Sequence, residues 1–516
     1  MDQNLETQDQ AVAQESTATT AQPNKFHNTR FGKLFGLKPD TSLRTEFIAG
    51  LTTFFAMCYI IIVNPNQITG FYSYLGGEVS AIWQAVYVGT IIAAVLGTLL
   101  YAFLAKKPFA QASGMGLNSF FFTSFILPCA IKDPDSNVIG FEHLATNYGA
   151  GLAIILISGL IFLILSITGL RSYIAKSLPD CLKKAIPAGI GLFIALLGFK
   201  GAFIVTDNPY TLVQLGDLTK WEIFNIYGEL AGGAAPMLAA FLGFIAIVIF
   251  AKSNVKALKN MSIVLGILVS SVLFYLFTWT APNFSFSSLG DSFTNFGKYG
   301  FSLFKPKSWS AAFDGVTIGS IFSVIILVIT FCLVDMFDTI GTLYGASAQA
   351  GMLDENGDPI DIEKSMLCDS IATCAGSMVG TSTVTTYVES ASGVAEGGRT
   401  GFTAFVTAML FLACLFLTPL ASIIPGVATA PALIYVGVLM LRNFKAIDMD
   451  DLSSAVPAFL TLILMPLTYS ISNGIAVGAI AYVLIQLFTG KYNKKDIVVT
   501  IIAILFGLRF AFVNTL

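Results

Sequence analysis

Two features of this chain could do chemistry inside a membrane: carboxylates within apolar segments, and polar side chains in glycine-rich runs. The run 380–401, GTSTVTTYVESASGVAEGGRTG, lies between long apolar segments, yet small and hydroxylated residues dominate it, and Glu389 stands in its middle. Lipid offers no partners to free backbone N–H and C=O groups, so a non-helical run at this depth must be buried in protein or line a watery cavity. A carboxylate at such a place indicates a functional site that faces the interior.

Glu389 also has a second interpretation. The residues Thr386-Tyr387-Val388-Glu389 fit a T-x-x-E capping box, in which Thr386 caps a helix that starts at Tyr387 and Glu389 satisfies a backbone donor. The two roles are compatible, because a half-helix that starts inside the membrane turns its positive N-terminal end toward whatever binds there.

A second set of polar residues lies in the apolar stretch 333–345, LVDMFDTIGTLYG. Asp335, Asp338 and Thr342 fall at positions i, i+3 and i+7, so they share one helical face. Two carboxylates three residues apart in an apolar helix repel each other when both are charged, and we expect one of them to hold a proton at neutral pH. This arrangement suits proton coupling. Alternatively, one aspartate caps a neighbouring broken helix, or the pair begins a cytoplasmic stretch.

A third set is QASGMGLN, residues 111–118, a glycine-rich polar interruption of another apolar segment. Asn118 offers both a donor and an acceptor, and Gly114 and Gly116 let backbone approach backbone. The alternative is that these small residues serve only close helix packing. Interrupted segments at matching positions of two halves are the best sequence pointer to a transporter site.

The composition is that of a polytopic helical membrane protein, because 55% of the 516 residues are hydrophobic and only 11% are charged. A soluble domain carries about a quarter charged residues. The net charge of −3 and the dispersed basic residues argue against nucleic acid as a partner. Without a cysteine pair, a histidine cluster or a nucleotide-binding motif, the sequence predicts no metal, no cofactor and no enzyme.

The apolar segments have lengths near the roughly 20 residues that a bilayer requires. In the first half we predict spans at 46–64, 83–104, 114–131, 148–170, 185–205, 237–251 and 262–278. In the second half we predict 318–344, 367–380, the interrupted run 380–401, 403–423, 430–441, 456–471 and 475–488. The fold class is therefore all-α, with about fourteen transmembrane segments, of which the third and the tenth are broken and contain short extended pieces.

Basic residues support this layout, because cytoplasmic loops collect Lys and Arg. With a cytoplasmic N-terminus, the inner side receives Lys106, Lys107, Arg171, Lys176, Lys183, Lys184, Lys252, Lys256, Lys259, Lys364, Arg399, Arg442, Lys445, Lys491, Lys494 and Lys495. The outer loops hold only Lys132, Lys220, Lys298, Lys305 and Lys307. Because each half has an odd number of spans, the second half enters the membrane from the opposite side, which makes an inverted repeat of seven plus seven segments, typical of secondary transporters.

The chain then divides into six regions. We expect a disordered tail (1–24), a basic membrane-proximal segment (25–45), the first repeat (46–280), an extracytoplasmic loop (281–316), the second repeat (317–490) and a C-terminal tail with a short apolar segment (491–516). The basic segment is predicted either to lie on an anionic membrane surface as an interfacial helix or to flank the first span.

At these residues the sequence resembles a known family, the AzgA-like purine permeases of the nucleobase cation symporters, within the xanthine/uracil permease superfamily. The resemblance covers nearly all of residues 35–491. It is carried by TTFFAMCYIIIVNP from Thr52, GMGLNSFF from Gly114, DMFDTIGTLYG from Asp335, GTSTVTTYVESASGVAEGGRTG from Gly380 and ATAPALIYVGVLM from Ala428.

The resemblance implies a multi-pass protein of the cytoplasmic membrane with a transport core and a gate domain that commonly forms a homodimer. It implies import of hypoxanthine, guanine or adenine with protons by an elevator-like motion of the core. It assigns substrate binding to Glu389, Asn118, Asp335, Ser382 and Thr342, and proton coupling to Asp338, Asp335 and Glu389. A purine fits these groups, since a carboxylate accepts from ring N–H donors while an amide answers the ring acceptors.

Two alternatives remain at the level of sequence. A transporter of the same architecture could carry uracil, xanthine or an anion, although an anion would fit poorly beside three carboxylates. A channel is the other, and the pairing of carboxylates with broken half-helices favours alternating access over it.

Overall fold

The computed structural model describes residues 26–71, 77–132, 139–170, 177–208, 212–224, 230–282, 287–313, 318–355, 359–421 and 423–512. The first half contains the helices α2 (Arg30–Phe35), α3 (Leu43–Met57), α4 (Ile60–Ile68), α5 (Gly77–Leu100), α6 (Met115–Phe121), α7 (Leu144–Ile167), α9 (Asp180–Gly201), α10 (Ala234–Ala251), α11 (Lys256–Asn260) and α12 (Ser262–Thr278). The second half contains α13 (Ser287–Asn295), α14 (Pro306–Phe313), α15 (Ile318–Ala350), α16 (Ile362–Met378), α17 (Ser390–Ala395), α18 (Gly401–Ala413), α19 (Thr418–Ala421), α20 (Gly426–Met440), α21 (Leu452–Leu467), α22 (Ile471–Phe488) and α23 (Ile497–Phe512).

Within the described residues, eight short strands form four antiparallel pairs. They are β1 (Gln111–Ser113), β2 (Ala130–Lys132), β3 (Ile139–Phe141), β4 (Val205–Asn208), β5 (Leu212–Leu215), β6 (Ile223–Phe224), β7 (Leu230–Gly232) and β8 (Val384–Thr386). Three of the pairs join neighbours in the sequence, whereas β1 pairs with β8 across more than half of the chain.

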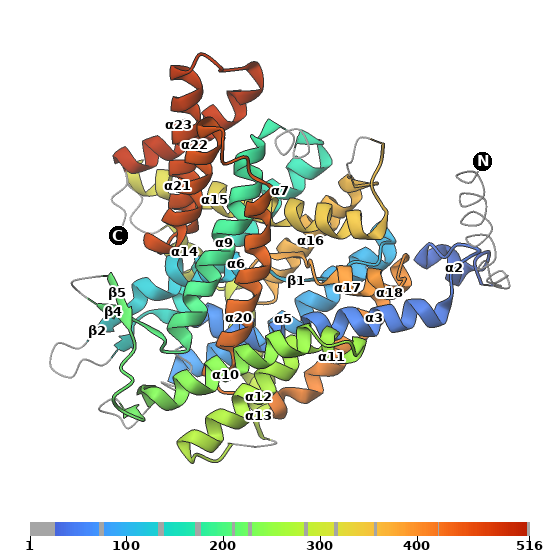
Figure 1. Cartoon of the computed structure of the whole chain (residues 1–516), viewed down its shortest axis with the longest axis vertical. Helices are drawn as coiled ribbons and strands as arrows, with labels where there is room; N and C mark the ends of the chain where they lie inside the picture. The colour runs from blue at the N-terminus through green and yellow to red at the C-terminus, as the bar shows by residue number, and fades with distance from the viewer. Residues whose placement is uncertain are drawn as a thin grey trace, which may run out of the picture.

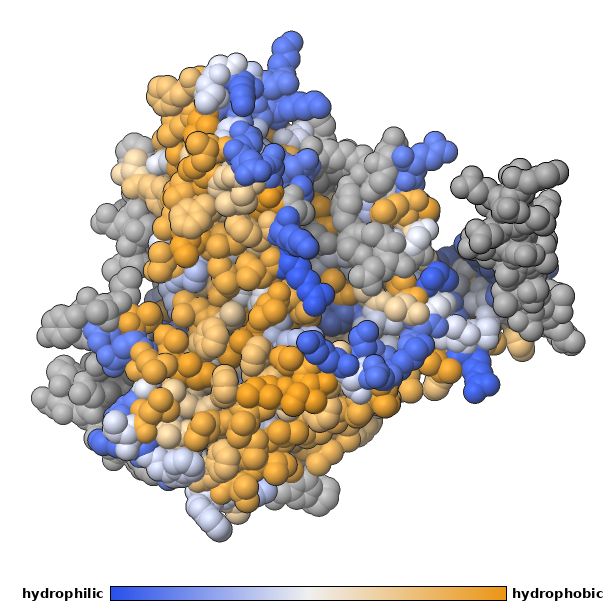
Figure 2. Space-filling model, in the orientation of Figure 1, coloured by the Kyte–Doolittle hydropathy of each residue, from blue (hydrophilic) through white to orange (hydrophobic). Residues whose placement is uncertain are grey.

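Within the described residues, seven helical stretches are long and apolar enough to cross a membrane. They are Leu43–Ile68, Gly77–Ala105, Leu144–Ile167, Asp180–Gly201, Ala234–Ala251, Gly401–Ala421 and Ile471–Phe488. Figure 2 shows that apolar residues cover most of the visible face, on the surfaces of α10, α12 and α21 to α23. Such a face is expected of a protein surface in contact with lipid. A multi-pass membrane protein is therefore confirmed, while the count of fourteen spans in two inverted repeats stays a prediction.

The helices pack in two groups. The helices α9, α10, α12, α20, α21 and α22 contact one another, and the helices α3 to α7 and α15 to α18 form the second group around β1 and β8. Figure 1 places β1 in the middle of the molecule, with α10 and α12 along one side and α21 to α23 at one end. The two groups touch through few elements, among them α9 with α6 and α15, and α20 with α4.

The pairing of β1 with β8 is what brings the two polar interruptions together. Gln111, Ala112 and Ser113 face Thr386, Thr385 and Val384 in antiparallel register, and all six residues are buried. Each strand leads into a short helix: β1 into α6, and β8 into α17. The backbone groups that a helix would have satisfied internally are thus satisfied between two distant segments.

Two glycines allow the flanking helices to approach this strand pair closely. A Cβ added to Gly97 of α5 would lie 2.7 Å from Gln111 Oε1 and 3.1 Å from Val384 Cγ1. A Cβ added to Gly376 of α16 would lie 2.7 Å from Val384 Cγ2. The two strands are therefore packed between α5 and α16. Neither position 97 nor position 376 has room for a side chain larger than that of glycine.

The predicted division of the chain into six regions stays a prediction. The tail 1–24 lies outside the described residues. The basic segment contains α2, whose Phe35 ring contacts that of Phe402 at 5.4 Å between centroids, so this helix packs on the start of α18. The loop 281–316 contains the helices α13 and α14, and the C-terminal apolar segment is the helix α23, which packs on α22 and α15.

Replacing Gly376 with valine should destabilise the fold, because the added methyl groups would push β8 away from α16. Overpacking of this kind costs about 1–3 kcal/mol. We expect a lower apparent melting temperature of the purified protein in detergent. The control is Gly290→Val in α13, where a Cβ meets no atom within 4 Å; equal losses for both variants would show that the strand pair is not tightly held.

Candidate functional site

Glu389 stands at the start of the half-helix α17 and receives a hydrogen bond from the first long helical stretch. The Tyr59 hydroxyl donates to Glu389 Oε1 at 2.6 Å. Tyr59 lies between α3 and α4 and is 2% exposed, whereas Glu389 is only partly buried. The carboxylate therefore has one oxygen fixed by tyrosine and sits at the edge of the buried strand pair.

Asn118 lies in α6 and connects the two interruptions directly. Its Oδ1 accepts a hydrogen bond from the Ser382 hydroxyl, and its Nδ2 donates to Gln67 Oε1 at 3.3 Å. Gln67 in turn donates to the Ser119 hydroxyl at 3.3 Å. All four residues are buried, so α4, α6 and the residues before β8 share one polar cluster.

Asp338 faces the start of α6. Its Oδ2 lies 3.6 Å from the position that a Cβ on Gly114 would take, next to the Thr383 hydroxyl and the Thr385 side chain. The carboxylate is only partly buried, and it interacts electrostatically with Asp369 and Glu389. A negative group beside the N-terminal end of α6 is favourable, because the first backbone N–H groups of a helix carry partial positive charge.

Asp335 and Asp369 are more deeply buried than Asp338, and both accept hydrogen bonds from hydroxyl or amide groups. Thr373 donates to Asp335 Oδ2 at 3.1 Å. Asp369 accepts from Gln111 Nε2 at 2.9 Å and also from the Thr339 hydroxyl. Buried carboxylates need such donors, because desolvating an unpaired charge costs several kcal/mol.

The structure thus brings Asn118, Ser382, Asp338 and Glu389 to the crossing of β1 and β8, with Asp335 behind them. Thr342 is not part of this cluster through its hydroxyl, which donates to the carbonyl oxygens of Asp338 and Thr339 in its own helix. A threonine in a helix interior often makes this bond, and the ligand role of Thr342 stays a prediction.

The capping-box interpretation is wrong. Thr386 is the last residue of β8, and its hydroxyl bonds to that of Tyr101 at 2.7 Å. The helix α17 begins at Ser390, with Glu389 in the N-cap position and without a side-chain cap bond. Helix capping therefore does not explain why a carboxylate stands at position 389.

Three further polar residues at the site were not predicted from the sequence: Asp369, Tyr59 and Gln67. Asp369 carried a signal, since it is a carboxylate within an apolar helical segment. Tyr59 and Gln67 carried none, because an aromatic or an amide near a span fits ordinary packing as well. Within the described residues there is no group of three or more His, Cys, Asp or Glu that could hold a metal ion.

The fold is that of a helical multi-pass membrane protein. The structure is similar to the transmembrane domain of a cyanobacterium bicarbonate transporter, BicA, with a TM-score of 0.55 and 15% identity, over 84% of this chain and 97% of that one. It is also similar to the murine anion transporter Slc26a9 in its inward-facing state, with a TM-score of 0.53 and 12% identity, over 93% of this chain and 75% of that one. At these identities the similarity concerns the fold alone.

The chain belongs to the Permease family, which matches residues 44–477, so the resemblance seen in the sequence is confirmed. It is 38% identical to the guanine/hypoxanthine permease PbuG of Bacillus subtilis, over 92% of this chain and 98% of the relative. It is 37% identical to the adenine permease AdeP of Escherichia coli, over 92% of this chain and 94% of the relative. Both relatives are named permeases, that is, transporters and not enzymes.

The contact between Asn118 and Ser382 should be measurable as an interaction energy. In a double-mutant cycle of Asn118→Ala and Ser382→Ala, the second truncation should cost less than it does alone, because its partner is already missing. We expect a non-additivity of about 0.5–3 kcal/mol in the unfolding free energy of the purified protein. Asn118→Ala combined with Thr468→Ala, an exposed residue of another helix group, is the control, and additivity in both cycles would contradict the contact.

Proposed function

We propose that the protein is a secondary active transporter that imports purine nucleobases, namely hypoxanthine, guanine or adenine, together with protons across the cytoplasmic membrane. The observation that carries this proposal is the pairing of β1 with β8, which gathers one carboxylate and one amide between two half-helices. Family membership and the names of the purine-permease relatives support the substrate class.

The hydrogen-bonding groups of Glu389 and Asn118 match those of a purine. The base presents ring N–H donors and adjacent ring acceptors on a planar, neutral frame, so its recognition needs an acceptor and a donor in fixed positions. Glu389 supplies the acceptor, with one oxygen held by Tyr59. Asn118 supplies the amide, fixed by Ser382 and Gln67. Sites built from hydrogen-bonding groups reject analogues that lack a partner more strongly than apolar pockets do.

The distribution of charge favours a neutral base over an anion, although one of the structural neighbours is a bicarbonate transporter. In residues 111–121 and 381–395 the only charged side chain is Glu389, and the facing helices α15 and α16 add Asp335, Asp338 and Asp369. An anion would meet this negative field without a Lys or Arg in residues 111–121 or 381–395 to balance it. Uracil or xanthine remains the alternative within the same architecture.

Proton coupling is proposed for Asp338, together with Asp335 and Glu389. Asp338 interacts with two other carboxylates, Asp369 and Glu389, and three negative charges so close together in a protein interior repel strongly. A proton bound in this cluster relieves the repulsion, so the purine and the proton would favour each other's binding. Asp369 joins the proposed set on the evidence of its contacts.

For the movement, we propose that the group around β1 and β8 carries the site as a core, and that the group of α9, α10, α12 and α20 to α22 serves as the gate. The few contacts between the groups support a sliding, elevator-like motion. We assign the N-terminal side to the cytoplasm from its basic residues. Three contacts support the placement of these basic residues on one common side of the membrane. They join Lys106 to Lys33, Lys107 to Ile360 and Lys256 to Glu396.

The proposal is tested by uptake of labelled hypoxanthine, guanine, adenine and uracil in cells that lack their own permeases, with and without a protonophore. We expect saturable uptake of at least one purine that the protonophore abolishes. Uptake of uracil alone would assign another substrate, and purine uptake that ignores the protonophore would remove the proton from the mechanism. Membrane insertion is verified in the same cells by an epitope tag.

Glu389→Gln should weaken purine binding at least tenfold, because the amide offers a single acceptor oxygen and a donor that faces the N–H groups of the base. This loss corresponds to about 1.4 kcal/mol. Equilibrium binding of labelled hypoxanthine to the purified protein measures the effect. The matched control is Glu396→Gln, which removes the neighbouring carboxylate that pairs with Lys256; unchanged binding in Glu389→Gln would take Glu389 out of the site.

A further inference from the structure

The C-terminal end of α4 connects the proposed core to the proposed gate by a buried hydrogen bond. Asn66 lies in α4, and its Nδ2 donates to the Thr429 hydroxyl of α20 at 3.2 Å. Both residues are buried, with exposed fractions of 3% and 0%. The hydrogen bond therefore joins the helix group around β1 and β8 to the group that contains α9 and α20.

The partners of Asn66 determine which way its amide points. The indole nitrogen of Trp83, in α5, donates to Asn66 Oδ1 at 2.6 Å, and an indole N–H can only donate. The amide nitrogen must then face Thr429, whose hydroxyl donates to the Gly426 carbonyl oxygen at 2.7 Å and still has a lone pair that can accept. Donors and acceptors are thus matched, and separating α4 from α20 would leave buried polar groups unpaired until they find new partners.

Phe71, which follows α4, makes a second contact with the gate. A Cβ added to Gly201, at the end of α9, would lie 3.3 Å from Phe71 Cζ. A Cβ added to Gly426, at the start of α20, would lie 3.6 Å from Phe71 Cδ1. The ring therefore occupies the space that larger side chains at these two positions would take, and it packs on two gate helices at once.

The backbone of Phe71 is strained. Its φ of 65° is in the left-handed region, which is unfavourable for a residue with a bulky side chain. The Phe71 N–H donates to the Asn66 carbonyl oxygen at 2.8 Å, so the residue that bonds to Thr429 also holds Phe71 in place. Strain of this kind persists only where the surroundings hold it, and it is common in switch regions.

The helix α4 also carries a residue of the polar cluster at the strand crossing. Gln67, next to Asn66, accepts a hydrogen bond from Asn118 Nδ2 at 3.3 Å. Successive residues of a helix point about 100° apart around its axis, so one helix can present Asn66 to the gate and Gln67 to the cluster. The contact with the gate is therefore one residue away from a group that fixes the amide of the proposed purine site.

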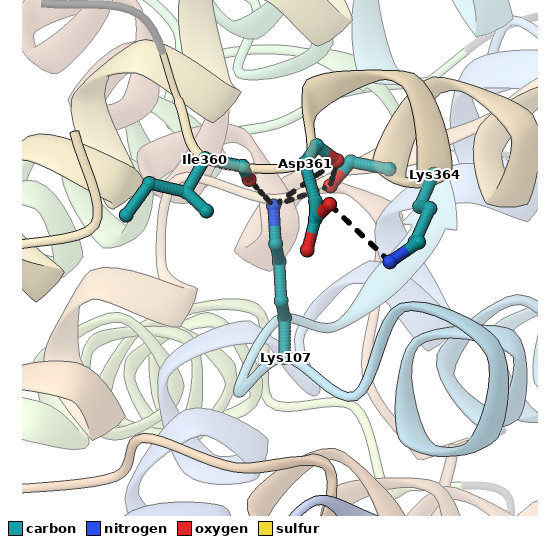
Figure 3. A network of polar contacts seen from close by, with 5 residues as sticks. Lys107, Ile360, Asp361 and Lys364 are labelled. Carbon is teal, nitrogen blue, oxygen red and sulfur yellow. Dashed lines mark hydrogen bonds and ion pairs between the residues drawn. The ribbon is translucent and has the colours of Figure 1, made fainter. Parts of the chain in front are cut away.

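Contacts within the core indicate that α4 moves together with it. The helix packs on α5 and α6. Figure 3 shows the side chain of Lys107, which precedes β1, pointing at the segment before α16, where the ammonium donates to the carbonyl oxygens of Ile360 and Asp361. Together with the pairing of β1 and β8, Lys107 joins the two halves of the core. A sliding motion of the core would therefore break contacts with the gate, and those of Asn66 and Phe71 are among them.

We propose that Asn66 and Phe71 form a closing contact on the outer side of the protein, which holds the core on the gate and must open before a purine can enter from outside. The contact lies on the outer side because the first helical stretch, Leu43–Ile68, ends there when the N-terminus is cytoplasmic. This inference rests on the proposed transport and orientation. It names residues that control access to the purine site without binding the base.

The closing contact predicts an unusual kinetic effect. Only the fraction of molecules that is open to the outside can bind external purine, so the contact lowers the apparent affinity. Removing the contact raises that fraction, and the KM of uptake should therefore fall. Damage to the purine site would raise the KM instead, and poor expression would change only the maximal rate.

The first experiment measures the KM for external labelled hypoxanthine, or adenine if the wild type prefers it, in cells that lack their own permeases. The variants are Thr429→Val, which keeps the shape of threonine without the hydroxyl that accepts from Asn66, and Phe71→Ala. The control is Thr461→Val, which removes a buried gate hydroxyl that donates to the Pro457 carbonyl in its own helix. We expect the KM to fall about threefold or more in both variants and to stay unchanged in the control. An unchanged or higher KM in Thr429→Val would overturn the closing contact, whether or not Phe71→Ala reaches the membrane.

The second experiment locks the contact. In a variant with both Phe71→Cys and Gly426→Cys, a short bis-methanethiosulfonate reagent joins the two thiols, and the single variants treated in the same way are controls for the native cysteines. We expect uptake to stop in the double variant and to return when a reductant removes the link. Uptake at the wild-type rate with the link in place would show that the contact does not have to open, and would overturn the proposal.

The wild type separates the two levels of inference. Purine uptake by the wild type, together with either contradictory result in the variants, would overturn the closing contact alone. A wild type that takes up no purine would overturn the proposed function itself and the closing contact with it.

Discussion

The structure depends on one constraint, which is that polar backbone in the middle of a membrane protein must find partners inside the protein. The pairing of β1 with β8 meets it by joining two segments that are far apart in the sequence. The glycines at 97 and 376 let α5 and α16 close over the strands. Because the two half-helices α6 and α17 start where the strands end, the same pairing fixes the relative positions of Asn118 and Glu389. Fold and site are thus consequences of a single contact.

The second consequence concerns charge. The carboxylates of Asp335 and Asp369 are buried and accept hydrogen bonds from hydroxyl and amide donors, as the contacts of Thr373 and Gln111 show. Neutral donors satisfy the buried carboxylate oxygens without adding a positive charge to the site. Asp338 and Glu389 are only partly buried, and the proposed purine site places them beside the ligand. This difference in burial agrees with the proposed coupling of purine and proton.

Much of this could be predicted from the sequence, because membrane insertion restricts the chain to a few patterns. Apolar length predicted segments that coincide with seven long apolar helical stretches among the described residues. The conflict between polar residues and membrane depth pointed to the two polar runs that contain β1 and β8. The sequence could not show that Asn118 meets Ser382, since such a contact depends on the register of two strands. For the same reason it misplaced Thr386 as a helix cap, whereas Thr386 is the last residue of β8. Tyr59 and Asp369 became visible only through their partners.

The most direct measurement is a structure of the protein with bound hypoxanthine. We expect the base at the crossing of β1 and β8, with a ring N–H within hydrogen-bond distance of the Glu389 carboxylate, and with the Asn118 amide on the opposite edge of the ring. Asp338 should lie beside the base without contacting it directly. A purine bound elsewhere, for example between the two helix groups and away from both half-helices, would contradict the claim that the strand crossing forms the site.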